Sequence, residues 1–104
     1  MDVQVTSVIP LEKGKARIRF EDGSEVILYK GEIRKLGIQE GCVITDEVYH
    51  KIIDEILGQR AIKRAMHLLE RQDRTERQLY DKLKENGYPE VCIESAISYV
   101  KRYH

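Results

Sequence analysis

The chain has 104 residues, of which 41% are hydrophobic and 35% charged, and its formal net charge is zero. Such a composition excludes a disordered chain, and no apolar run approaches the roughly 20 residues that span a bilayer. The length allows one domain, or one small domain with an appendage. The N-terminus lacks the features of a secretion signal, so Cys42 and Cys92 are expected to be reduced thiols in a cytoplasmic protein.

The first thirty residues are predicted to form antiparallel strands. In residues 16–20 apolar and basic side chains alternate, which is typical of a half-buried strand. The apolar positions, expected on one face, are Ala16, Ile18 and Phe20. Asp22-Gly23 suits the positive φ values of a type I′ turn, so residues 16–29 are predicted to form a hairpin. Residues 3–10 are predicted to add a third strand.

The middle of the chain is predicted to be helical. A short helix should follow the strands and end at Gly37. Beyond a cap at Thr45 or Asp46, apolar residues recur with helical spacing as far as residue 71. Gly58 interrupts this pattern at a cost of about 1 kcal/mol relative to Ala. We expect one long helix from about residue 46 to 71, with a bend possible near Gly58.

Two more short helices are predicted after residue 74. Thr75 and Gln78 form a capping box of the T-x-x-Q type at the start of the first. Gly87 should end that helix in the left-handed conformation, and Pro89 fits the first turn of the second. The positions expected to be buried are Leu79, Leu83, Ile93, Ala96, Ile97 and Val100.

The expected fold class is therefore α+β. An N-terminal β-hairpin or three-stranded antiparallel sheet should be followed by a long helix and a compact three-helix repeat. Residues 1–45 would form a β-rich extension with a short helix, and residues 46–104 a helical region that contains the repeat, residues 59–104. A hairpin on a movable linker is prone to exchange between chains, so a hairpin-swapped homodimer is one alternative.

Charge is unevenly distributed along the chain. Residues 1–57 hold 8 basic and 11 acidic residues, a balance of −3, whereas residues 58–104 hold 10 and 7, a balance of +3. A basic segment of this kind favours an acidic partner, nucleic acid included, although long charged side chains that merely coat a helix give the same pattern. The candidate partner-binding and nucleic-acid-binding residues are Arg60, Lys63, Arg64, Arg71, Arg74, Arg77, Lys82 and Lys84.

No pattern in the sequence predicts catalysis, a cofactor or a metal site. His50 and His67 lack a second ligand at helical spacing, and phosphate-binding and nucleophile motifs are absent from the sequence. The four tyrosines of the helical region are expected to pack beside apolar stripes more than to stack on bases. They are Tyr80, Tyr88, Tyr99 and Tyr103. The residues alone therefore indicate no active site.

Residues 61–103 resemble the first helical repeat of the RecX regulatory proteins, which modulate the RecA recombinase. The positions that carry the resemblance are Ala61, Ala65, Leu69, Arg74, Thr75, Gln78, Leu79, Leu83, Gly87, Tyr88, Ile93, Ile97 and Val100. Two positions depart from the family pattern: Gln78 stands where Glu is more common, and Asn86 where the family has a basic residue. The β-rich segment is similar to the variable N-terminal extension of many members.

The resemblance implies a regulator that lies in the groove of the RecA–DNA filament and inhibits recombinase activity in DNA repair, recombination and the SOS response. It implies a binding protein and not an enzyme, in contact with the RecA filament and with DNA contact possible. It also implies further repeats, so we expect this chain to be an N-terminal fragment of about half a full-length member. The alternatives are a stand-alone DNA-binding three-helix module and an oligomerisation module.

Overall fold

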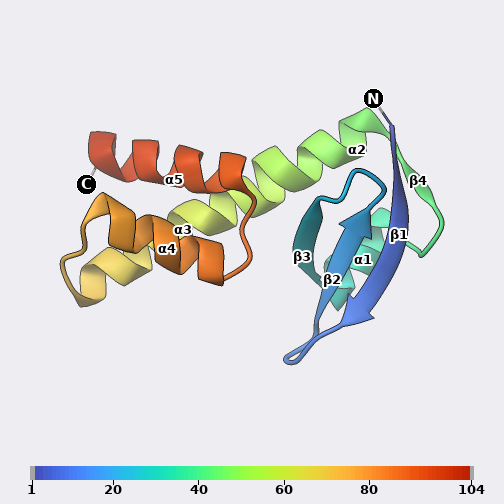
Figure 1. Cartoon of the computed structure of the whole chain (residues 1–104), viewed down its shortest axis with the longest axis horizontal. Helices are drawn as coiled ribbons and strands as arrows, with labels where there is room; N and C mark the ends of the chain where they lie inside the picture. The colour runs from blue at the N-terminus through green and yellow to red at the C-terminus, as the bar shows by residue number, and fades with distance from the viewer. Residues whose placement is uncertain (1, 104) are drawn as a thin grey trace. The chain divides into compact units, whose positions relative to one another are not determined.

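The computed structural model describes residues 2–103 and divides the chain into two compact units, Met1–His50 and Lys51–His104. The first unit contains a four-stranded sheet and two short helices, and the second is built from helices (Figure 1). The expected α+β fold class is confirmed. We describe each unit by itself.

The sheet of the first unit is antiparallel, in the order β3-β2-β1-β4. Its strands are β1 (Val3–Pro10), β2 (Lys15–Phe20), β3 (Glu25–Tyr29) and β4 (Val43–Ile44). The first three were predicted. The fourth was not, because a strand of two residues has no periodicity that a sequence pattern can reveal.

The alternation predicted for β2 is present. Its apolar residues are buried and lie opposite buried residues of β3: Ala16 pairs with Leu28, and Ile18 with Val26. Opposite residues of an antiparallel pair share one face, so these side chains form a common core layer. These strands pair within one chain, and the hairpin-swapped homodimer gains no support.

The turn between β2 and β3 differs from the prediction. Asp22 does not have a positive φ; only Gly23 does, at 87°, and the amide of Gly23 donates to the carbonyl of Phe20. The hairpin therefore has a longer connection, not a type I′ turn. The residue pair with two positive φ values is instead Lys13-Gly14, at 60° and 73°, between β1 and β2.

Helix α1 (Lys30–Leu36) follows β3 and lies behind the sheet in the view of Figure 1. The Glu32 carboxylate accepts a hydrogen bond from the amide of Tyr29 at 2.9 Å, which satisfies one of the amides at the helix start. Gly37 ends the helix at φ 70°, as predicted. Beyond it, Ile38 and Ile44 are buried and complete the core of this unit.

The long helix expected from residue 46 to 71 is one uninterrupted helical segment, but its middle is not α-helical. It consists of α2 (Asp46–His50), the π-helical turns η1 (Lys51–Leu57) and α3 (Gly58–Arg71). A Cβ atom at Gly58 would lie 3.1 Å from the carbonyl oxygen of Ile53. The glycine thus stands where the wider π turns give way to the α-helix.

Helices α4 (Glu76–Glu85) and α5 (Glu90–Tyr103) begin and end close to the predicted positions. The capping box is complete: the amide of Gln78 donates to Thr75 Oγ1 at 3.1 Å, and the amide of Thr75 donates to Gln78 Oε1 at 2.9 Å. Gly87 has a φ of 89°. Pro89 was expected in the first turn of α5, but it lies just before Glu90, the first residue of that helix. Its carbonyl accepts the first helical hydrogen bonds of α5.

Helix α3 packs against both α4 and α5 around an apolar core. The buried residues of these three helices include Ala61, Ala65, Leu68, Leu79, Leu83, Cys92, Ile93, Ala96 and Val100. Of the positions predicted to be buried, Ile97 is only half-buried. The alanines of α3 keep the helices close, and the larger side chains of α4 and α5 fill the space between them.

Candidate interaction surface

Four of the predicted basic residues share the solvent side of α3. With 3.6 residues per turn, Arg60, Lys63, Arg64 and Arg71 fall within an arc of about 100° that excludes the buried alanines of α3. We call these four residues the α3 basic face. Lys63 and Arg71 are exposed, and the other two are half-buried.

His67 lies inside this arc and is exposed, yet the sequence analysis did not count it among the candidates. The spacing gives the signal, since His67 is four residues from both Lys63 and Arg71. Residues four apart are neighbours on a helix surface. His67 therefore lies between the two exposed cations of the α3 basic face.

Arg64 also has a structural role. Its Nε atom donates a hydrogen bond to Asn86 Oδ1 at 3.0 Å, and Asn86 is the residue that caps the end of α4. The pair joins the middle of α3 to the end of α4. Asn86 is one of the two departures from the RecX pattern, and its amide oxygen accepts this hydrogen bond where a basic side chain would repel Arg64.

The three basic residues of α4 have acidic partners. Arg77 lies 3.2 Å from Asp81, and Lys82 lies 3.8 Å from Glu85. Lys84 lies 3.6 Å from Glu90. Exposed pairs of this kind add little stability, but each carboxylate reduces the local positive potential.

These three residues also do not share one face. Arg77 and Lys84 are seven positions apart and lie on the same side of α4, whereas Lys82 is two positions from Lys84 and lies on the opposite side. The eight predicted residues therefore do not form a single patch.

Arg74 lies in the connection between α3 and α4 and is half-buried. Its Nε atom is buried without a hydrogen-bond partner among residues 2–103. A buried donor of this kind is costly when nothing accepts from it. Arg74 therefore belongs to the loop between α3 and α4 and not to the α3 basic face.

The tyrosines of the helical unit differ in their exposure and in their hydrogen-bond partners. The hydroxyl of Tyr80 donates to the Glu90 carboxylate at 2.6 Å, and this hydrogen bond raises the pKa of the Tyr80 phenol. Tyr80 is thus engaged at the junction of α4 and α5. Tyr103 is 66% exposed, and its ring centroid lies 4.8 Å from that of Tyr99.

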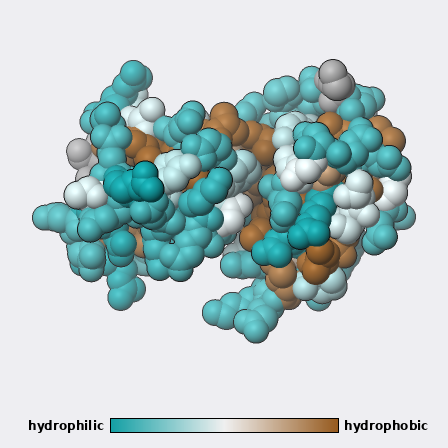
Figure 2. Space-filling view, viewed as in Figure 1, coloured by the Kyte–Doolittle hydropathy of each residue, from teal (hydrophilic) through white to brown (hydrophobic). Residues whose placement is uncertain are grey.

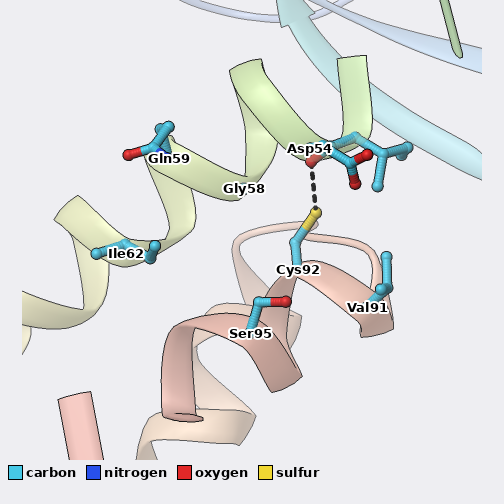
Figure 3. A pocket seen from close by; sticks show the side chains of 8 residues that line it. Asp54, Gly58, Gln59, Ile62, Val91, Cys92 and Ser95 are labelled. Atoms are coloured by element: carbon cyan, nitrogen blue, oxygen red, sulfur yellow. Dashed lines mark hydrogen bonds between the residues drawn. The ribbon is translucent and has the colours of Figure 1, made fainter. Parts of the chain in front are cut away.

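A small cavity of about 200 Å³ lies beside the π-helical turns (Figure 3). Its lining includes Asp54, Gly58, Val91 and Cys92. The Cys92 thiol donates to the carbonyl of Ile53 at 3.4 Å. Burial, together with the charge of Asp54, raises the pKa of this thiol to about 11. The thiol is therefore protonated at neutral pH and is a weak nucleophile.

Nothing in residues 2–103 builds a metal centre, since no three His, Cys, Asp or Glu side chains come together there as ligands. Within the same residues, no helix has the length and apolar character that a bilayer requires. The surface is mostly hydrophilic over the helical unit in the face seen in Figure 2. Fold and surface together define a small α+β protein whose helical unit is a three-helix domain with a basic outer face.

Comparison with known proteins identifies the family. Residues 61–99 match the profile of the RecX first three-helix domain. The regulatory protein RecX of Caldanaerobacter subterraneus subsp. tengcongensis is 38% identical over 100 residues, which cover 95% of this chain and 51% of that protein. The regulatory protein RecX of Clostridium perfringens strain 13 is 35% identical over 72 residues, which cover 69% of this chain and 34% of that protein. The chain belongs to the RecX family, and the predicted resemblance is confirmed.

The chain spans about half the length, or less, of these curated relatives. A solved structure described as a crystal structure of regulatory protein RecX is 19% identical, with a TM-score of 0.47, over 95% of this chain and 49% of that one.

Proposed function

We propose that this chain acts as a regulator that binds the RecA–DNA filament and inhibits recombinase activity in DNA repair and recombination. Membership of the RecX family supports this function, because the matched residues 61–99 include most of the three-helix domain. A binding role, not catalysis, and a cytoplasmic location belong to the same proposal.

The observation that carries the proposal is the α3 basic face. Within residues 2–103, its exposed cations Lys63 and Arg71 have no acidic partner at ion-pair distance, unlike the cations of α4. A filament wound on DNA presents a long anionic surface, and a convex helix face with unneutralised cations complements such a surface better than a closed pocket does. Of the eight predicted residues, we therefore assign the main contacts to the α3 basic face.

The DNA-dependent ATPase activity of RecA, measured as this chain is added, tests the proposal. We expect inhibition that saturates with the concentration of the chain and weakens as salt is raised. The double variant Lys63→Gln/Arg71→Gln should need a several-fold higher concentration for the same inhibition.

The double variant Arg77→Gln/Lys84→Gln is the matched control. It also removes two positive charges from the helical unit, but both already have acidic partners. It should inhibit almost as well as the unmodified chain. Equal losses in the two variants would show that net charge alone matters, and an ATPase rate that does not respond to the chain would refute the proposal.

A further inference from the structure

The outer face of the sheet in the first unit is a second basic surface, separate from the RecX three-helix domain. On β2, every second residue is basic: Lys15, Arg17 and Arg19 alternate with the buried residues of the strand. They therefore point to the face of the sheet opposite the core. In Figure 2, hydrophilic side chains and an apolar patch lie side by side over these strands.

The neighbouring strands give this surface its other side chains. Opposite the three cations on β3 are Tyr29, Ile27 and Glu25. Ile9 of β1 lies on the other side of Arg17. With three cations and one anion among the residues of β1, β2 and β3 on this face, its local charge is +2. We call this surface the β2 basic face.

The cations are held in place and remain accessible. Arg17 and Arg19 lie 3.3 and 3.4 Å from the two oxygens of Glu25, and their side chains are 38% and 50% exposed. A single carboxylate thus orients two guanidinium groups without neutralising both. Lys15 Nζ lies 5.7 Å from the centroid of the Tyr29 ring, and Tyr29 is 43% exposed.

The arrangement favours a particular ligand. Alternate residues of a strand are about 6.8 Å apart, so the cations form a straight row that an extended, regularly charged chain can follow. An exposed aromatic ring beside such a row is the combination that binds single-stranded nucleic acid, because phosphates meet the cations and a base stacks on the ring. An acidic peptide would match the charges but would make no use of the ring face.

We propose that the β2 basic face binds single-stranded nucleic acid, with Arg17 and Arg19 on phosphates and Tyr29 stacked on a base. This site goes beyond the proposed function, which uses α3. It would give the protein a contact with nucleic acid that needs no recombinase.

The test uses the whole chain, a fluorescently labelled oligothymidylate and anisotropy at several salt concentrations, with no recombinase present. Arg17→Gln/Arg19→Gln should weaken binding and flatten the slope of log K against log salt by about 1.4, or about 0.7 for each lost phosphate contact. Tyr29→Ala should weaken binding about fivefold or more, whereas Tyr29→Phe, which keeps the ring, should not.

The variant Glu25→Gln distinguishes a ligand-binding role of the two arginines from a structural one. It frees both guanidinium groups and raises the charge of the face, so binding should become tighter. A merely structural role of the ion pairs predicts no such gain. Arg34→Gln/Lys35→Gln on α1 removes two exposed cations from the same unit and is the matched control, with little expected change.

Two results would overturn the proposal. One is equal loss in the β2 and α1 double variants, which would mean that only net charge attracts the oligonucleotide. The other is binding of an oligoglutamate peptide with the same affinity and no effect of Tyr29→Ala, which would assign the face to an acidic polypeptide. Either result would leave the role of α3 in filament binding untouched, because no variant in this test alters α3.

Discussion

Individual side chains in this protein have roles that their types alone do not reveal. Lys13 adopts a φ of 60°, a conformation that glycine and asparagine tolerate better than lysine does. Arg64 is one of eight predicted contact residues, but its hydrogen bond to Asn86 makes it part of the framework as well. The charge of a residue could be read from the sequence, whereas its partner could not, because the partner lies 22 positions away.

Lys13→Asn is expected to stabilise the protein by about 0.5–1 kcal/mol, because Asn-Gly is the preferred pair for a type I′ turn. Urea unfolding of the variant measures the change. Lys13→Val is the opposite control, since a β-branched residue with positive φ is strained and should destabilise. If asparagine and valine shifted the unfolding midpoint equally, the assignment of the strained turn would be wrong.

The Cys92 thiol predicts a specific pH dependence. The pKa of Cys92 in the folded state is about 11, above the ordinary value of 9.0. The contribution of the protonated thiol to the free energy of unfolding is therefore fully present below pH 9 and is lost as pH rises towards 11. The loss across this window is about 2–3 kcal/mol at most. Urea unfolding across the window should show a steeper decline for the unmodified chain than for Cys92→Ala. Parallel declines would contradict the buried, protonated thiol.

At the scale of secondary structure, the ends of elements proved more predictable than their internal geometry. Thr75, Gln78 and Gly87 marked the limits of α4 correctly, because caps act through local contacts that neighbouring residues encode. The π-helical turns before Gly58 were not predicted, since a change from α to π leaves the apolar spacing almost unaltered. The eight candidate contact residues stay a prediction; their division between different faces could not be seen from charge alone, because helix register separates Lys82 from Lys84.

Thr75→Ala is expected to lower the free energy of unfolding by about 1 kcal/mol, because the amide of Gln78 loses its acceptor. Chemical denaturation measures the difference. Thr75→Ser keeps the hydroxyl and should retain most of the stability. A serine variant as unstable as the alanine variant would point to the lost methyl group instead of the cap.

Leu83→Ala is expected to cost about 2–5 kcal/mol, because Leu83 is 0% exposed in the core of the three-helix unit. Thermal and chemical unfolding both report the loss. Val91→Ala on the exposed side of α5 removes part of an apolar side chain outside the core and should cost far less. Similar costs at the two positions would contradict the packing of the unit.

At the scale of the whole molecule, a net charge of zero conceals two basic surfaces, one in each unit. The sequence analysis located the helical surface from its excess of basic residues, but it overlooked the sheet, where acidic residues elsewhere in the first unit give a negative total. Alternation along β2 separates three cations from those acids. Total charge therefore predicts partners less well than the charge of a single face.

The most direct test of the central claim is binding of the fluorescently labelled chain to RecA filaments assembled on single-stranded DNA with a non-hydrolysable nucleotide. We predict saturable binding that Lys63→Gln/Arg71→Gln weakens and that Arg77→Gln/Lys84→Gln leaves nearly unchanged. Absence of binding to the assembled filament, or binding that neither pair of substitutions alters, would contradict the assignment of the α3 basic face as the surface that meets the recombinase.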